Sequence, residues 1–318
     1  MSLRRFLLIR FGWAFFALWL AVTTLFVITR VISLRAEDFR TIGHPPARDE
    51  FVEALRLDDP IHERYADFLW AAARQDFGDS LRSGRGSRAI AAQALPATLS
   101  LVVPALGLAV LVGWAVAIPL RRAPPRRRYV WRIPVSIAVG IPPLLLGIWL
   151  SYYVGFKGRW LPITGYCDFF DPPSGSGCGG AVDWTEHLVL PWITLGLFFA
   201  AIYTRVLRAW LREVASASAE SRPRLARRAR GATARLIARD FGFAIGVAVF
   251  VEGAFSIPGL GRTVVIGLDT RDFRVAEAAL LYAAFIAIAI HLVVDVIVGA
   301  LDEDLRAEWP VAGMPVRP

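Results

Sequence analysis

Long apolar stretches alternate with charged segments along this chain, and each stretch has about the length of a membrane-spanning helix. Four of them contain no Asp, Glu, Lys or Arg: residues 11–29, 97–120, 133–156 and 187–204. Two more carry one acid each, Glu252 within 241–260 and Asp295 within 278–301. A bilayer core of about 30 Å needs about 20 helical residues to cross it. The pattern therefore predicts an all-α, polytopic membrane protein.

The predicted protein has six transmembrane helices, at about 8–31, 96–120, 133–156, 187–210, 241–261 and 276–301. No internal repeat and no low-complexity linker divides the chain. We therefore expect residues 1–318 to form a single transmembrane domain. Two of its connections are long, an extracytoplasmic segment over 32–95 and a cytoplasmic region over about 211–240.

The arginines predict the orientation of these helices. Segment 121–132 has six Arg and no acid, and segment 205–240 has ten Arg against three acids. Segment 32–94 has eleven acids against nine Arg. Because positively charged connections stay in the cytoplasm, both termini and the two arginine-rich segments are expected inside. The protein is then a multi-pass membrane protein with both termini in the cytoplasm.

Composition and motifs exclude several other functions. The net charge of +9 resides in short segments that flank the apolar stretches, as topology requires, so no nucleic-acid partner is expected. No G-x-x-x-x-G-K-[ST] loop is present, so this chain lacks the usual phosphate cradle of an ATPase. With no metal-binding cluster and no nucleophile triad in the sequence, the chain is predicted not to be an enzyme.

The two cysteines, Cys167 and Cys178, both lie in the connection between the third and fourth apolar stretches. The arginine distribution places that connection outside, in an oxidising compartment, which favours a local disulfide. Two free thiols in a flexible loop are the alternative. No His lies between or beside the cysteines in sequence, so a metal site is not expected.

The extracytoplasmic segment is expected to contain two helices. One begins near Pro46, with acids in its first turn. The other begins at Ile61 and carries Tyr65, Phe68 and Leu69 at helical spacing. These helices could lie on the outer leaflet or cap a pore, or they could form a small cap that only packs.

Six sequence motifs, in order along nearly the whole chain, resemble one family of transport proteins. They are LRLDDPIHERYADFLWAAARQDFGDSLRSG (55–84), ALPATLSL (94–101), LPITGY (161–166), HLVLPWITLGL (187–197), VEGAFSIPGLGR (251–262) and HLVVDVIVGALDEDLR (291–306). The chain is thereby similar to inner-membrane permease subunits of dipeptide, oligopeptide and nickel ABC importers, within the binding-protein-dependent transport permeases. The VEGAFSIPGLGR motif is the most specific of the six.

This resemblance implies a type I importer permease that works in a larger complex. A sister permease would form the other half of the pathway, and an extracytoplasmic solute-binding protein would deliver peptides or related small solutes. Two cytoplasmic ATP-binding subunits would bind ATP and Mg, so no cofactor is expected in this chain.

The resemblance also implies an ATPase-coupling helix between the fourth and fifth spans. Ala229, Arg230 and Gly231 resemble the alanine–basic–glycine part of that helix, with Gly231 at a turn and Arg227 and Arg228 beside it. The chain departs from the family pattern, because the fifth span follows sooner and no proline occurs between 223 and 258. Either a short docking helix is rebuilt over 223–235, or coupling is weakened, or these arginines only set topology.

Three ionisable residues lie within the predicted spans. A carboxylate in lipid is costly, so Glu252 should face the bundle, a partner or a water-filled path; a purely structural, hydrogen-bonded role is the alternative. Asp295 is expected to snorkel to the cytoplasmic edge or to pair with an arginine. His291, one turn earlier, is expected to make a pore-side or interhelical hydrogen bond. Gly259 and Gly261 are expected to permit a tight turn.

Two other functions are compatible with six spans. A stand-alone secondary transporter would show paired repeats with broken helices and coupling-ion carboxylates, none of which the sequence contains. A degenerate, non-transporting membrane scaffold of the same fold is favoured only by the shortened region after Gly231.

Overall fold

Helices make up nearly all of the computed structural model, which describes residues 2–32, 59–80, 82–121, 140–170 and 178–301. A helix satisfies its own backbone hydrogen bonds, which a bilayer without water requires. Within those ranges no strand occurs, only an isolated bridge between Asp79 and Gly86. The predicted all-α class is confirmed.

Eight α-helices are present in the described ranges. They are α1 (Leu3–Phe26, continued by a π-helical turn, Val27–Ile32), α3 (Ile61–Arg74), α4 (Ser87–Arg121), α6 (Pro143–Leu150, continued by a π-helical turn, Ser151–Lys157), α7 (Gly180–Ser216), α8 (Arg222–Phe255), α9 (Leu260–Asp269) and α10 (Phe273–Leu301).

The long helices match most of the predicted spans. Among the described residues, α1, α4, α7 and α10 are each long and apolar enough to cross a bilayer. Together α8 and α9 form a fifth candidate that is bent by 72°. The predicted third span, 133–156, is described only from residue 140, in α6 and its extension. The count of six spans therefore stays a prediction.

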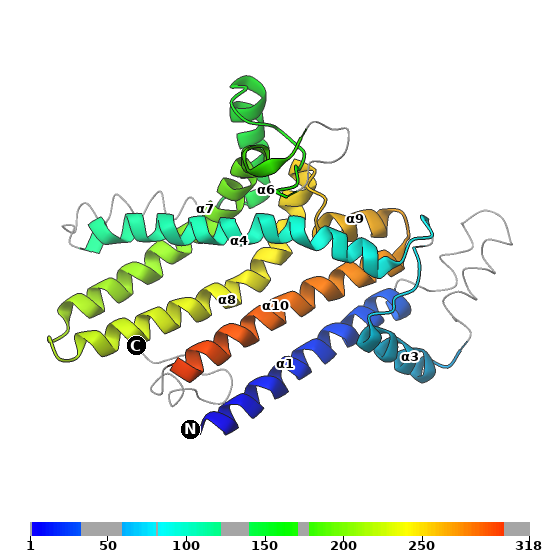
Figure 1. The fold of residues 1–318 in the computed structure, drawn as a ribbon, viewed down its shortest axis with the longest axis horizontal. Helices are drawn as coiled ribbons and strands as arrows, with labels where there is room; N and C mark the ends of the chain where they lie inside the picture. The colour runs from blue at the N-terminus through cyan, green and yellow to red at the C-terminus, as the bar shows by residue number, and fades with distance from the viewer. Residues whose placement is uncertain (1, 33–58, 81, 122–139, 171–177, 302–318) are drawn as a thin grey trace.

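Three arginine-rich parts of the chain gather at one end of the molecule. The start of α1, the end of α4 and the α7–α8 turn lie at the left of Figure 1, as does the end of α10, whereas α3 and α9 lie at the right. Successive spans that alternate in direction place their like-charged connections on a shared side in this way.

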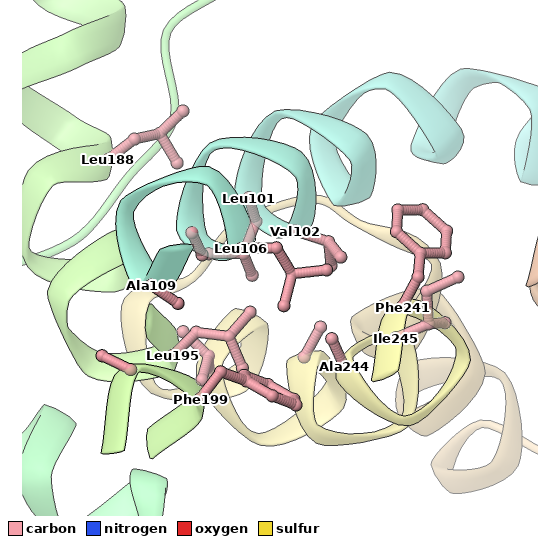
Figure 2. Close-up of a cluster of buried hydrophobic side chains, with 14 of the residues drawn as sticks. Leu101, Val102, Leu106, Ala109, Leu188, Leu195, Phe199, Phe241, Ala244 and Ile245 are labelled. Carbon is pink, nitrogen blue, oxygen red and sulfur yellow. The ribbon is translucent and has the colours of Figure 1, made fainter. Parts of the chain in front are cut away.

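The main hydrophobic core lies between α4, α7 and α8 (Figure 2). Leu101 from α4, Leu195 and Phe199 from α7, and Ala244 from α8 are all fully buried there. Helices α4 and α7 approach closely, because a Cβ added at Gly196 would lie only 2.8 Å from the carbonyl oxygen of Ala105. Small residues at such crossings are typical of membrane helix pairs, where close packing replaces the hydrophobic driving force.

A second core joins α1, α3, α4, α9 and α10. The predicted helix start at Ile61 is confirmed by α3, and this helix packs against the end of α1. The rings of Phe68 and Tyr65 lie 5.5 and 5.2 Å from that of Phe26. The helix predicted from Pro46 lies outside the described residues.

The region between the predicted fourth and fifth spans differs from the expectation. Helix α7 continues to Ser216, a turn of residues 217–221 follows, and α8 begins at Arg222 and runs unbroken to Phe255. The prediction of a turn at Gly231 is therefore wrong. One glycine costs a helix about 1 kcal/mol, and the surrounding alanines and arginines are strong helix formers that offset this cost.

Candidate functional site

The VEGAFSIPGLGR motif forms the bend of 72° between α8 and α9. Helix α8 ends at Phe255, Ser256 adopts a left-handed conformation with φ of 56°, and α9 starts at Leu260. Residues 241–255 of α8 span about 22 Å at the usual rise per residue, which is less than the bilayer core of about 30 Å. The apolar part of α8 alone is therefore shorter than a span, and the bent α8–α9 pair forms either a broken span or a re-entrant loop.

Glu252 organises this bend from the last turn of α8. Its side chain is 0% exposed, and its two carboxylate oxygens accept hydrogen bonds from different elements. The hydroxyl of Thr98, on α4, donates to Oε1 at 2.7 Å, and the backbone N–H of Arg262 donates to Oε2 at 2.9 Å. The backbone N–H of Leu260 donates to the same Thr98 hydroxyl oxygen at 2.8 Å.

These bonds cap α9. The first N–H groups of a helix have no partner within it, and its N-terminus attracts negative charge. Glu252 and Thr98 supply acceptors to two of the α9 N–H groups from two other helices. Glu252 thus lies inside the bundle, hydrogen-bonded on both oxygens.

Two glycines leave room for the Glu252 carboxylate. A Cβ at Gly259 would lie 2.3 Å from the Glu252 carboxyl carbon, and a Cβ at Gly261 would lie 2.6 Å from the Cα of Val249. Gly259 has φ of −92°, which any residue adopts, so its backbone does not need glycine for the turn. The expected reason for these glycines is therefore corrected: close packing around the carboxylate excludes a larger side chain.

The other end of α9 is held by the segment that precedes α4. The Ser80 hydroxyl donates to the carboxylate of Asp272, and both residues are buried. The Ser80 oxygen also accepts the backbone N–H of Ser83 at 3.0 Å. The guanidinium of Arg274, at the start of α10, donates to the carbonyl oxygen of Asp79 at 3.3 Å. Helix α9 is consequently fastened at both ends to α4 or to the residues just before it.

The loop before α7 carries the two cysteines, and the structure joins Cys167 and Cys178 in a disulfide with a Cα–Cα distance of 5.6 Å. His187 of α7 also lies here, with Nδ1 at 3.3 Å from the Cys167 sulfur. The three side chains could group around a metal ion, which the sequence spacing did not reveal. Bridged sulfurs are not thiolate ligands, so the disulfide and a Cys₂His metal site exclude each other.

The same loop contacts the bend. The backbone N–H of Gly165, in the LPITGY motif, donates to the carbonyl oxygen of Phe255 at 2.9 Å. The hydroxyls of Tyr166 and Ser100 lie 3.3 Å apart. Two of the sequence motifs, LPITGY and VEGAFSIPGLGR, therefore meet in space.

A buried ion pair joins the arginine-rich first half of α1 to the last turns of α10. The Arg10 guanidinium lies 3.1 Å from the Asp295 carboxylate, with side chains 10% and 2% exposed. His291 Nε2 lies 3.3 Å from the same carboxylate, one turn away on α10. These residues line a cavity of about 420 Å³ between α1, α8 and α10. Of the two roles expected for Asp295, the structure shows pairing with an arginine. His291 was expected to make a pore-side or interhelical hydrogen bond, but it contacts Asp295 of its own helix.

The five predicted coupling residues all lie in the first half of α8. Arg227 and Arg230 are exposed, and Arg228, Ala229 and Gly231 are half-buried. The turn before α8 is closed by its own serines, because the backbone N–H of Arg222 donates to the Ser218 carbonyl at 3.0 Å. The structure brings none of these residues near Glu252, which belongs to the other end of α8.

Sequence reasoning missed Thr98 and Arg10 as partners of Glu252 and Asp295, and it missed the Ser80–Asp272 pair altogether. Thr98 and Ser80 do fall within quoted motifs, ALPATLSL and the segment 55–84. A hydroxyl side chain within an apolar stretch or a motif was the sequence signal that could have identified them. Nothing in the linear order, however, pairs residues 154 positions apart, as Thr98 and Glu252 are.

Comparison with known proteins agrees with this architecture. Residues 109–307 match the family described as "Binding-protein-dependent transport system inner membrane component". The chain is 30% identical over 315 residues to the glutathione transport system permease protein GsiC of Shigella flexneri, covering 90% of this chain and 95% of the relative. The corresponding proteins of Salmonella typhi and Escherichia coli are also 30% identical, with 94% and 95% of their lengths covered.

These matches define the class of protein. The bundle of apolar helices with a bent, motif-bearing segment is that of a membrane permease subunit of an importer. The chain belongs to the family of binding-protein-dependent transport system inner membrane components, as the sequence motifs predicted.

Proposed function

We propose that this chain forms half of the pathway of an ATP-driven importer that takes up short, peptide-like solutes, with glutathione as the first candidate. The observation that carries this proposal is the likeness, over 90% of the chain, to glutathione transport system permease proteins. A sister permease supplies the other half, an extracytoplasmic binding protein delivers the solute, and two cytoplasmic subunits bind ATP and Mg.

The docking surface for the ATP-binding subunits is the α7–α8 turn with the first turns of α8. This hairpin projects at the left of Figure 1, at the arginine-rich end of the molecule. Arg224, Arg227 and Arg230 are exposed on the first turns of α8, and their spacing of three residues puts them along one side of the helix. A basic helix side of this kind fits a cleft that carries acidic residues.

The docking experiment compares two charge reversals in the purified complex. Arg227→Glu with Arg230→Glu should lower transport-coupled ATP hydrolysis by about tenfold or more, because like charges now face each other across the docking surface. Arg4→Glu with Arg5→Glu, on the exposed start of α1, is the matched control and should leave that hydrolysis near the parent value. ATPase activity and glutathione uptake in proteoliposomes are the measurements.

Each result has a clear meaning. Unchanged uptake in the α8 variant would remove this segment as the docking element. Failure of any ATP-binding subunit to co-purify with the parent chain would overturn the importer proposal and favour a membrane scaffold.

The proposed orientation places residues 32–95 outside and the α7–α8 turn inside. Ser83 and Ser218 are both exposed in the structure, so each accepts a reporter. In a background with Cys167 and Cys178 replaced by serine, an impermeant thiol reagent should label Ser83→Cys in intact cells. It should label Ser218→Cys only after the membrane is opened. Labelling of Ser218→Cys in intact cells would reverse the proposed topology.

A further inference from the structure

A buried hydrogen-bond junction joins three helices at the bend between α8 and α9. Thr98 contributes from α4, Glu252 from α8, and the N–H groups of Leu260 and Arg262 from α9. The Thr98 hydroxyl uses its only proton toward Glu252 and accepts from Leu260. Replacing either side chain therefore leaves at least one buried polar group without its partner.

This junction lies where backbone irregularity marks function in membrane proteins. A bent span leaves backbone groups that lipid cannot satisfy, and such bends are tolerated only inside protein or beside a water-filled cavity. Carboxylates at membrane depth are similarly rare and functional. The bend and the Glu252 carboxylate both lie in the VEGAFSIPGLGR motif, at the opposite end of α8 from the docking surface.

Helix α9 itself has two different sides. Leu260, Gly261, Val264 and Gly267 are buried against the bundle. Val265, Ile266 and Leu268 are between 41% and 48% exposed. Since the junction and the Ser80–Asp272 contact hold both ends, α9 presents this second side at a fixed position relative to α4.

We propose that Glu252 and Thr98 are positioning residues for transport: they lock α9 to α4 so that the two move as one rigid unit when the outer end of the pathway opens and closes. This inference rests on the proposed function for its transport consequence. The lock itself is a property of the chain that is measured without transport.

The first measurement is amide hydrogen exchange in the purified complex in lipid nanodiscs. Thr98→Val and Glu252→Gln should each speed exchange of the amides of residues 260–262 by about tenfold or more, because each removes charge-assisted or buried hydrogen bonds from them. The double variant should exchange little faster than either single one, since both act through one network. Thr98→Ser, which keeps the hydroxyl, should restore protection.

The second measurement is uptake kinetics in proteoliposomes. Thr98→Val should lower the maximal rate several-fold with little change in KM, because the docking of the binding protein is untouched, and Thr98→Ser should recover the rate. Gly196→Ala weakens the α4–α7 contact without touching α9, so it controls for general loss of stability. At a matched fall in Tm it should retain a higher maximal rate than Thr98→Val.

The outcomes separate the two proposals. Unchanged exchange at residues 260–262 in both single variants would refute the lock, whatever the transport result. Exchange could be faster while the maximal uptake rate of Thr98→Val is no lower than that of Gly196→Ala at a matched fall in Tm. That result would refute a role of the lock in transport. A parent complex that takes up no solute would overturn the proposed function, while the exchange data would still decide whether the lock exists.

Discussion

Replacing Gly196 with leucine should abolish recovery of the folded protein. This glycine lies on α7, and a Cβ there would be 2.8 Å from the carbonyl oxygen of Ala105 on α4. The obstructing atom belongs to the backbone of a long helix, so it cannot turn aside as a side chain can. Overpacking a well-packed core commonly costs about 1–3 kcal/mol, and a leucine at a backbone contact belongs at or above the upper end of that range.

The matched control is Gly107→Leu on α4. A Cβ at Gly107 meets no heavy atom within 4 Å, so the same substitution adds bulk without a clash. Thermal unfolding and gel-filtration recovery of the detergent-solubilised protein measure the difference. Equal behaviour of the two variants would contradict the close α4–α7 approach that organises the main core.

Replacing Asp295 with alanine should lower the free energy of unfolding by about 3–5 kcal/mol, the usual cost of removing one partner of a buried ion pair. The Arg10 guanidinium would stay buried after losing the carboxylate that lies 3.1 Å away. Because both side chains are almost inaccessible to solvent, little screening by water or salt softens this loss.

Two further variants test whether the loss comes from the buried Arg10 charge that has lost its partner. Changing Arg10 and Asp295 together to leucine should recover much of the stability, since a buried pair is often replaceable by apolar residues. His291→Gln should cost less than about 1 kcal/mol, because the His291 side chain is 42% exposed. Chemical or thermal unfolding in detergent provides the comparison. A double variant as unstable as Asp295→Ala would show that packing, and not charge, sets the effect.

Much of the architecture could be predicted before the structure. Uninterrupted apolar runs can be satisfied in a bilayer only as helices, which is why the positions of α1, α4, α7 and α10 follow from composition. The amphipathic spacing of Tyr65 and Phe68 likewise predicted α3. The motifs identified the family, because six short patterns in a conserved order are far more specific than any one of them.

Predictions from local sequence patterns were wrong where a long-range contact or a competing helix propensity determines the structure. A glycine between arginines suggested a turn at Gly231, but the flanking helix formers carry α8 through it. The glycines of PGLGR suggested a turn, but their small size serves the carboxylate of Glu252. At Gly231 no turn forms, whereas at PGLGR the chain does bend but the glycines are needed for close packing.

By itself, the sequence determined the all-α class, the segments that carry the arginines and the family to which the chain belongs, because hydrophobic length, charge and motif order are all properties of neighbouring residues. Only the tertiary structure decided what Glu252 and Asp295 do. A carboxylate inside a bundle is acceptable only with partners, and those partners, Thr98 on α4 and Arg10 on α1, are brought within hydrogen-bond distance by helix packing that no local pattern records.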